Sequence, residues 1–204
     1  MNSIEVYVLE TDAPDDTSGL AALVENGEID PEQIIGILGK TEGNGCVNDF
    51  SRGLAATAYR HALADWLGCS TDAVDDSVAL IISGGTEGVM TPHVAVFVEC
   101  ADSGQATVGK GLVGAQISTR EFDPAELGRR PQICATADAV QTAMGEAGIV
   151  SSDDLHYAQV KCPLLSAQQI SDVEARGDST VCSDTYESMG YSRGASALGV
   201  AIAA

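Results

Sequence analysis

Lysine, arginine and serine are the side chains in this sequence whose positions could support chemistry on a carbonyl group. Lys40 and Lys161 each follow a short apolar run, in a chain that has only three lysines. A lysine that is partly desolvated at the end of a strand has a lowered pKa and can take a proton from a serine hydroxyl. The alternative is a strand-end lysine that simply reaches solvent.

Arg52 and Arg193 each precede an amphipathic pattern, so we expect both to open helices. The helix dipole disfavours a cation at this end, unless the side chain points at another group. A forked donor aimed at a carbonyl or carboxylate oxygen is the natural use of such an arginine. The alternative is a surface salt bridge with one of the 30 acidic residues.

Ser83 begins the glycine-rich loop Ser83-Gly84-Gly85. Glycines let the backbone approach a ligand closely, and an exposed hydroxyl beside free N–H groups can hold a carbonyl oxygen or an oxyanion. A plain tight turn and a phosphate cradle are the alternatives, although no GxxxxGK[ST] motif follows. His93 is not assigned a catalytic role, because a histidine at the start of a strand is more often structural.

Short apolar runs predict the strands that position these residues. In the first half of the chain they cover Ile4–Val8, Ile34–Leu38, Ser77–Ile82 and His93–Val98. Apolar residues that recur every four positions from Leu54 to Leu67 predict an amphipathic helix of about four turns.

The second half has similar patterns after an expected linker at 101–104. Strands are expected at Val108–Ile117 and Leu155–Val160, and a helix at Ala137–Ala147. We therefore expect one unit over residues 1–103 and a second of like topology over residues 105–204.

A repeated motif links the two units. Phe50-Ser51-Arg52-Gly53 recurs as Tyr191-Ser192-Arg193-Gly194, 141 positions later, and the helix register that follows recurs too. Internal duplication is the economical explanation, and two similar helix starts that arose by chance are the alternative. The same spacing places the counterpart of Ser83 near position 224, beyond the 204 residues of the chain.

Composition excludes several classes of partner. The formal net charge of −20 would repel nucleic acid and anionic membranes, and the acidic start does not resemble a signal peptide. We expect a soluble, cytoplasmic protein. The six cysteines form no CxxC pair and are expected to be small buried side chains, so neither disulfides nor a metal site is assigned.

Four segments of the chain resemble the hallmark segments of the cyanuric acid hydrolase and barbiturase family, and this resemblance spans the whole chain. The segments are IISGGTEGVMTPH (Ile81–His93), GKTEGNGCVNDFSRG (Gly39–Gly53), QVKCPLL (Gln159–Leu165) and DTYESMGYSRGASALGVA (Asp184–Ala201).

The resemblance implies an α+β fold built of pseudo-symmetric repeats, each a mixed sheet with helices, around a central site. Family members have three repeats, and each repeat gives a lysine, an arginine and a serine to that site. The chain then covers one complete repeat and one incomplete repeat. The substrate-binding residues implied by the resemblance are Lys40, Arg52, Ser83, Gly84 and Arg193.

Lys161 is implied as the catalytic lysine that activates a nucleophilic serine. Ser196 lies close to Arg193, but the duplication places it on a helix, at the position of Ala55, so we reject it as the nucleophile. The expected serine lies outside the chain, which predicts an inactive fragment.

The implied reaction is hydrolytic ring opening of a cyclic amide such as cyanuric acid or barbituric acid by a Ser-Lys mechanism. No organic cofactor is implied, and the family's metal site belongs to the third repeat. The implied partners are a small cyclic amide and further copies of the chain in a homo-oligomer. The alternative function is a noncatalytic subunit that binds cyclic ureides or takes part in an interaction.

Overall fold

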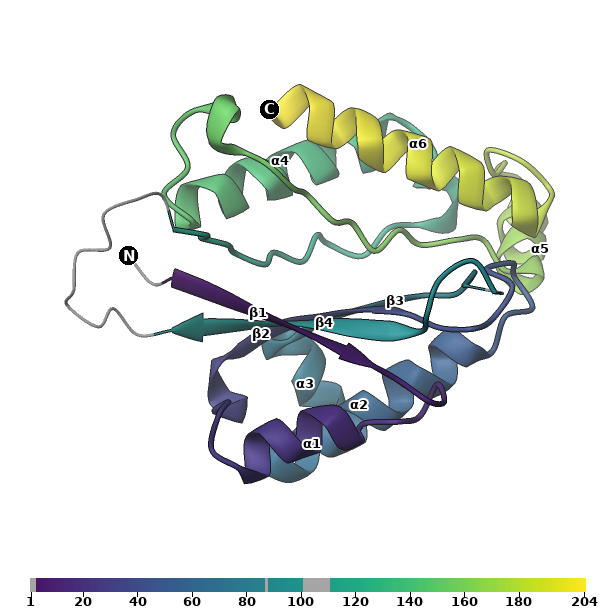
Figure 1. Cartoon of the computed structure of the whole chain (residues 1–204). Helices are drawn as coiled ribbons and strands as arrows, with labels where there is room; N and C mark the ends of the chain where they lie inside the picture. The colour runs from purple at the N-terminus through teal and green to yellow at the C-terminus, as the bar shows by residue number, and fades with distance from the viewer. Residues whose placement is uncertain (1–2, 87, 101–110) are drawn as a thin grey trace. The chain divides into compact units, whose positions relative to one another are not determined.

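The computed structural model describes residues 3–86, 88–100 and 111–204 (Figure 1). The chain divides into two compact units, residues 1–116 and residues 117–204. The expected linker at 101–104 and the expected boundary between residues 103 and 105 lie outside the described residues. The division into repeats therefore stays a prediction.

The first unit contains a four-stranded mixed sheet with the strand order β1-β4-β2-β3. Strand β2 runs parallel to β3, and β4 runs antiparallel to both β1 and β2. All four strands expected in this half are confirmed, although Ser77 belongs to the helix before β3. Their bounds are Ser3–Glu10 for β1, Ile34–Lys40 for β2, Ala79–Ser83 for β3 and His93–Cys100 for β4.

Three helices cover one face of this sheet (Figure 1). They are α1 (Ser18–Glu25), α2 (Ser51–Leu67) and α3 (Thr71–Ser77), and a 3-10 turn, η1, spans Pro31–Gln33. The expected helix after Arg52 is confirmed as α2, which ends at Gly68 with a positive φ of 64°. A left-handed residue at this position is the usual glycine stop of a helix.

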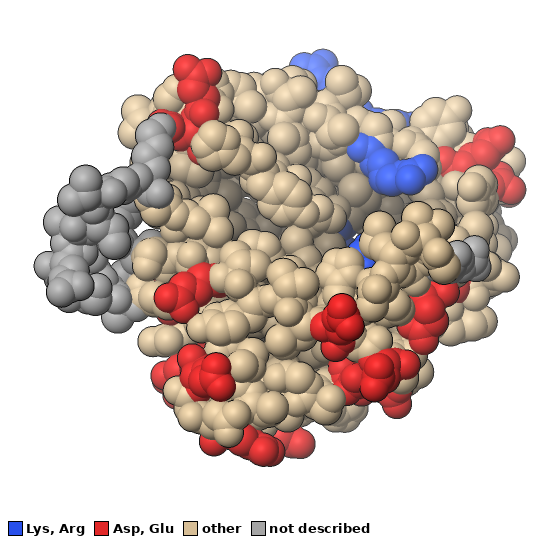
Figure 2. All heavy atoms as spheres, in the orientation of Figure 1, with Lys and Arg blue, Asp and Glu red and all other residues tan. Residues whose placement is uncertain are grey.

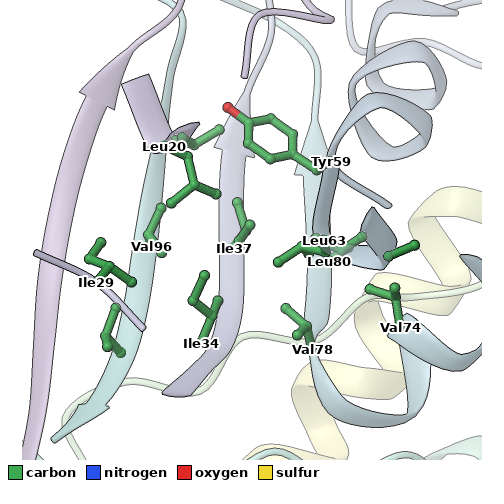
Figure 3. Close-up of a cluster of buried hydrophobic side chains, with 13 residues drawn as sticks. Leu20, Ile29, Ile34, Ile37, Tyr59, Leu63, Val74, Val78, Leu80 and Val96 are labelled. Atoms are coloured by element: carbon green, nitrogen blue, oxygen red, sulfur yellow. The ribbon is translucent and has the colours of Figure 1, made fainter. Parts of the chain in front are cut away.

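The core of the first unit lies between the sheet and these helices (Figure 3). Alternate residues of the strands, among them Ile37, Leu80 and Val96, meet Tyr59 and Leu63 of α2, because the side chains of a strand alternate between its faces. Burying these side chains is the main stabilising term of the unit. Lys40 lies three positions after Ile37 in β2, so its side chain points to the other face of the sheet.

The second unit is helical in its described residues, 117–204. Helix α4 packs along α6, and the helix expected at Ala137–Ala147 is confirmed as part of α4. Leu127, Leu165 and Ile170 form a small core, to which α5 contributes Ile170. The bounds are Pro124–Glu126 for η2, Arg130–Glu146 for α4, Ser152–Asp154 for η3, Ala167–Ala175 for α5 and Thr185–Ala203 for α6.

The two strands expected in the second half are wrong where the structure describes them. Residues 111–117 and 155–160 have no regular secondary structure, and residues 108–110 lie outside the described part. An apolar run becomes a strand only when a neighbour completes its hydrogen-bond ladder. Residues 155–160 have no such strand partner in the part of the chain that the structure describes.

The face of the molecule drawn in Figure 2 carries more acidic than basic side chains, as the composition predicts. Figure 2 shows Asp and Glu side chains spread over the visible face, with few Lys or Arg side chains among them. No helix among the described residues is long and apolar enough to cross a membrane.

The prediction of buried cysteines is wrong. Cys69 and Cys134 are exposed, the other four cysteines are half-buried, and all six are free thiols. Cys69 follows the last turn of α2, which shows how a cysteine at an element's end can lie outside the core.

Candidate active site

Lys40, Ser83 and Gly84 form a cluster at one end of the sheet, here called the Lys40 cluster. Parallel pairing of β2 with β3 places Lys40 directly beside Ser83. The Lys40 Nζ donates to the Ser83 Oγ at 3.3 Å and to the carbonyl oxygen of Gly84 at 2.5 Å. The structure therefore brings together three of the predicted site residues.

The loops that leave β2 and β3 continue side by side beyond the sheet. Thr41 N–H donates to the Ser83 carbonyl at 2.9 Å, Thr86 N–H to the Thr41 carbonyl at 3.2 Å, and Gly85 N–H to the Gly43 carbonyl at 2.5 Å. Gly85 has a φ of 94°, which favours glycine. Two parallel strands that end at one edge thus pass directly into a loop pair that holds Ser83 in place.

These hydrogen bonds correct one expectation about the glycine-rich loop. Its N–H groups were expected to be free to hold an oxyanion, but those of Gly85 and Thr86 are already bonded within the loop pair. The Ser83 side chain is exposed, so its hydroxyl can meet a ligand. Side-chain donors of the Lys40 cluster are accordingly better placed for a carbonyl oxygen than those two amides.

Arg52 is the second residue of α2, as expected from the motif. Its Nη2 donates to the carbonyl oxygen of Cys46 at 2.8 Å, and the side chain is half-buried. The preceding residue, Ser51, is linked to Thr41 by a hydrogen bond of 2.7 Å between the two hydroxyl oxygens. Since Thr41 follows Lys40, the start of α2 is tied to the end of β2.

A buried polar network beneath the Lys40 cluster was missed by the sequence reasoning. It consists of Thr41, Asp49, Ser51 and Thr86, of which Asp49 is 8% exposed and Thr86 1%. The available signal was the order Asp-Phe-Ser just before a helical pattern, because Asp and Ser are typical of helix starts. The long-range partners in the β3 loop have no such signal.

Arg193 does not open a helix, which corrects the expectation from the repeated motif. Helix α6 begins at Thr185, where the Asp184 side chain accepts a hydrogen bond from Glu187 N–H at 2.8 Å. This cap starts the helix earlier than in the first unit, so the helix-dipole argument does not apply to Arg193. Its exposed side chain donates from Nε to the Met189 carbonyl at 3.2 Å.

Lys161 lies in a segment without regular secondary structure rather than at the end of a strand, and the residue is exposed. Its neighbours Val160 and Cys162 line an open groove of about 300 Å³ together with Arg193. The second unit therefore brings the Lys161 segment and Arg193 to one groove. Their roles as catalytic lysine and substrate contact stay predictions.

Ser196 lies on α6, as the duplication predicts. The residue is 2% exposed, and its hydroxyl oxygen accepts a hydrogen bond from the Gln132 Nε2 at 3.0 Å. A hydroxyl engaged between two helices is poorly placed to attack a substrate, which is consistent with its rejection as nucleophile.

His93 pairs in register with Lys40 on the neighbouring strand β4. Its Nδ1 lies 2.8 Å from the carbonyl oxygen of Thr91, the contact of a structural histidine. The described residues contain no group of three His, Cys, Asp or Glu side chains that could hold a metal ion.

Comparison with known proteins decides the family. The sequence model of the amidohydrolase ring-opening protein family matches residues 5–204. The chain belongs to this family. The resemblance found in the four hallmark segments is thereby confirmed.

Named relatives are similar over nearly the whole chain. A protein of Enterobacter cloacae named cyanuric acid amidohydrolase is 52% identical over 202 residues, which are 98% of this chain and 55% of the relative. A solved structure of a cyanuric acid hydrolase is 48% identical to this chain and has a TM-score of 0.92. The match covers 100% of this chain and 56% of that chain. A second, from A. caulinodans, has a TM-score of 0.90 at 47% identity, with 100% of this chain and 55% of that chain covered.

The α+β fold class is confirmed by these two structures and by the mixed sheet. The chain spans about half the length of the relatives it matches.

Proposed function

We propose that the protein containing these 204 residues hydrolyses a C–N bond of a cyclic amide such as cyanuric acid or barbituric acid. The observation that carries the proposal is the identity of about half of all residues to proteins named cyanuric acid amidohydrolase, over nearly the entire chain. The Lys40 cluster supports it independently, since it groups donors that a ring with several carbonyl oxygens needs.

Substrate recognition is assigned to the Lys40 cluster, Arg52 and Arg193. A flat cyclic amide presents carbonyl oxygens around its rim, and each oxygen accepts hydrogen bonds from hydroxyl, ammonium or guanidinium groups. Ser83 and Lys40 supply two such groups within 3.3 Å of each other. Similar pairs of donors from the other repeats would bind the remaining carbonyl oxygens of the ring.

The chemical step is assigned to a serine activated by Lys161. Attack by the serine oxygen on a ring carbonyl forms a tetrahedral intermediate, and the serine proton passes to the lysine. The C–N bond then breaks, the ring nitrogen takes up that proton, and water releases the acyl group from the serine. By the repeat spacing this serine lies outside residues 1–204. The step requires no organic cofactor.

Location in the cytoplasm and assembly with further copies of the chain stay predictions. The acidic composition supports the expectation that the protein acts on a small molecule rather than on nucleic acid or a membrane surface.

The test is a ring-opening assay on the protein encoded by the complete reading frame that contains this chain. Consumption of cyanuric acid and of barbituric acid would be followed for the wild type, for Lys161→Ala and for residues 1–204 alone. The wild type is expected to open one of the rings. Both other proteins are expected to be slower by several orders of magnitude, on the order of the loss of a covalent nucleophile or its base.

Two results would contradict the proposal. Tight binding of a ring without turnover by the wild type would instead support a noncatalytic binding subunit. Turnover by residues 1–204 at the rate of the complete protein would show that the nucleophile has been placed wrongly, and Ser83 would then be the first alternative.

A further inference from the structure

Asp49 is a carboxylate buried beneath the Lys40 cluster, at the end of the loop that joins β2 to α2. Its Oδ2 accepts a hydrogen bond from Gly45 N–H at 2.7 Å. Its Oδ1 accepts from the Ser51 N–H at 3.0 Å and from the Ser51 Oγ at 2.6 Å. One side chain therefore binds both the loop and the first turn of α2.

The same carboxylate fills the space that two glycines leave open. A Cβ atom at Gly84 or at Gly43 would overlap the Asp49 carboxylate. Asp49 thus packs directly against the backbone of Gly84, which belongs to the Lys40 cluster, and against Gly43, whose carbonyl accepts from Gly85 N–H. A shift of this carboxylate would therefore displace the loop that carries Ser83.

The charge of Asp49 fixes the direction of the hydrogen bonds around it. Burial alone would raise its pKa, but the hydrogen bonds from Ser51 and Gly45 and the nearby Arg52 charge outweigh it and lower the pKa. An ionised carboxylate only accepts, so the Ser51 hydroxyl donates to Asp49. The Thr41 hydroxyl must then donate to Ser51, and the chain of bonds returns to the residue next to Lys40.

We propose that Asp49 is a positioning residue of the cyclic amide site. It holds Gly84 and the first turn of α2 in one fixed relation, so that Ser83 and Arg52 meet the same substrate. The proposal rests on the proposed function for the identity of the substrate. Asp49 acts through these residues and does not itself touch the ring.

Neither of the closest side chains can replace a carboxylate here. Asparagine has the same shape, but it must turn its amide hydrogens toward either the Gly45 N–H or the Ser51 donors, and one bond is lost. Glutamate has one more methylene, for which the contacts with Gly43 and Gly84 leave no space.

Asp16 offers a matched control in the same chain. Its Oδ1 accepts from the Ser18 N–H at 3.0 Å and the Ser18 Oγ at 2.6 Å, and its Oδ2 accepts from Asp12 N–H at 3.0 Å. Each of the two aspartates thus bonds a serine two residues after it and a backbone N–H four residues before it. Asp16 differs in lying before α1, whereas the Asp49 carboxylate packs against Gly84 of the Lys40 cluster.

The first experiment compares Asp49→Asn with Asp16→Asn in the protein encoded by the complete reading frame. Both substitutions are expected to lower the thermal midpoint, because each removes the same kind of hydrogen bond. Asp49→Asn is expected to raise KM for cyanuric acid about tenfold or more, as misplaced binding groups do. Asp16→Asn is expected to leave KM and kcat within about twofold of the wild type. Equal kinetic constants for the two variants would overturn the proposal.

A second variant separates position from charge. Gly43→Ala keeps the Asp49 charge and leaves the cluster's own residues unchanged, but its Cβ displaces the carboxylate. It is expected to raise KM as Asp49→Asn does, and an unchanged KM in a folded Gly43→Ala protein would overturn the proposal. If Asp49→Asn does not fold, the KM of Gly43→Ala still tests the proposal.

A third measurement needs no substrate and therefore distinguishes failure of this proposal from failure of the proposed function. Amide hydrogen exchange of the ligand-free protein reports on the Gly85 and Thr86 N–H groups, which bond across the loop pair. Faster exchange there in Asp49→Asn than in Asp16→Asn would support the positioning role, even if no cyclic amide is opened. Unchanged exchange at these amides would overturn the role whatever the substrate.

Discussion

The hydrogen bonds of Asp49 and Asp16 lower the pKa of each carboxyl group, so both residues make the stability of the protein depend on pH. The pKa of Asp49 is lowered in the fold although burial opposes this, and the pKa of Asp16 is lowered chiefly by its bonds with Ser18 and Asp12. A carboxyl whose pKa is lower in the folded state stabilises the protein above its unfolded pKa, near 3.8. This contribution is lost as the pH falls through the lowered value.

The first prediction concerns acid unfolding. Replacing both aspartates by asparagine is expected to lower the thermal midpoint near neutral pH and to flatten its decline at pH below about 4, since two groups no longer bind protons on unfolding. The measurement is the thermal midpoint of wild type and double variant from neutral to acid pH. Curves that stay parallel through the acid range would contradict the assignment of these pKa shifts.

Residues at the ends of predicted strands could be placed from the sequence, whereas a residue whose contacts lie far along the chain could not. Lys40 and Ser83 follow strand patterns, so their convergence at one sheet edge could be expected. Asp49 is one of 30 acidic residues, and its contact with Gly84 spans 35 positions of the chain. Arg193 was placed wrongly because motif similarity says nothing of the Asp184 cap that starts α6 earlier.

At the scale of elements, helices and strands differ in how far the sequence could predict them. A helix satisfies its backbone hydrogen bonds locally, and its amphipathic period is enough to find α2 and most of α4. The shorter α1, α3 and α5 give too few turns for a clear period. A strand depends on a neighbour far along the chain, which explains why residues 155–160 were expected to form a strand and do not.

The contact between α4 and α6 gives the second prediction. A Cβ at Gly199 would collide with the Thr136 side chain and the Ile133 carbonyl, whereas Gly190 of the same helix has open space around it. Gly199→Ala is expected to destabilise the protein by about 1–3 kcal/mol through overpacking. Gly190→Ala is expected to stabilise it by about 0.5–1 kcal/mol through helix propensity.

Urea unfolding of the two alanine variants and the wild type measures both free energies. Stabilisation by Gly199→Ala equal to that by Gly190→Ala would show that the two helices do not approach closely at Gly199.

At the scale of the whole molecule, the dominant feature is the net charge of −20. The many carboxylates repel one another in the folded state. Salt weakens this repulsion, because the screening length falls from about 10 Å at 0.1 M to about 3 Å at 1 M. The face seen in Figure 2 carries several separate patches of acidic side chains, with few basic ones among them.

The third prediction follows from this repulsion. The thermal midpoint is expected to be higher in 1 M than in 0.1 M sodium chloride, because the shorter screening length at 1 M weakens the repulsion between surface carboxylates. Sucrose at matched osmolality serves as the control, because it acts through exclusion rather than screening. A midpoint that falls with salt, or that rises equally with sucrose, would show that charge repulsion does not limit stability.

Binding of a cyclic amide by Lys40, Arg52 and Ser83 is the central claim, and a crystal structure tests it most directly. The protein encoded by the complete reading frame would carry Lys161→Ala, so that cyanuric acid binds without being opened. The predicted result is a ring whose carbonyl oxygen lies about 3 Å from the Ser83 Oγ, with the Arg52 guanidinium on the same ring. A ring bound away from the Lys40 cluster, in a protein of unchanged fold, would contradict the account.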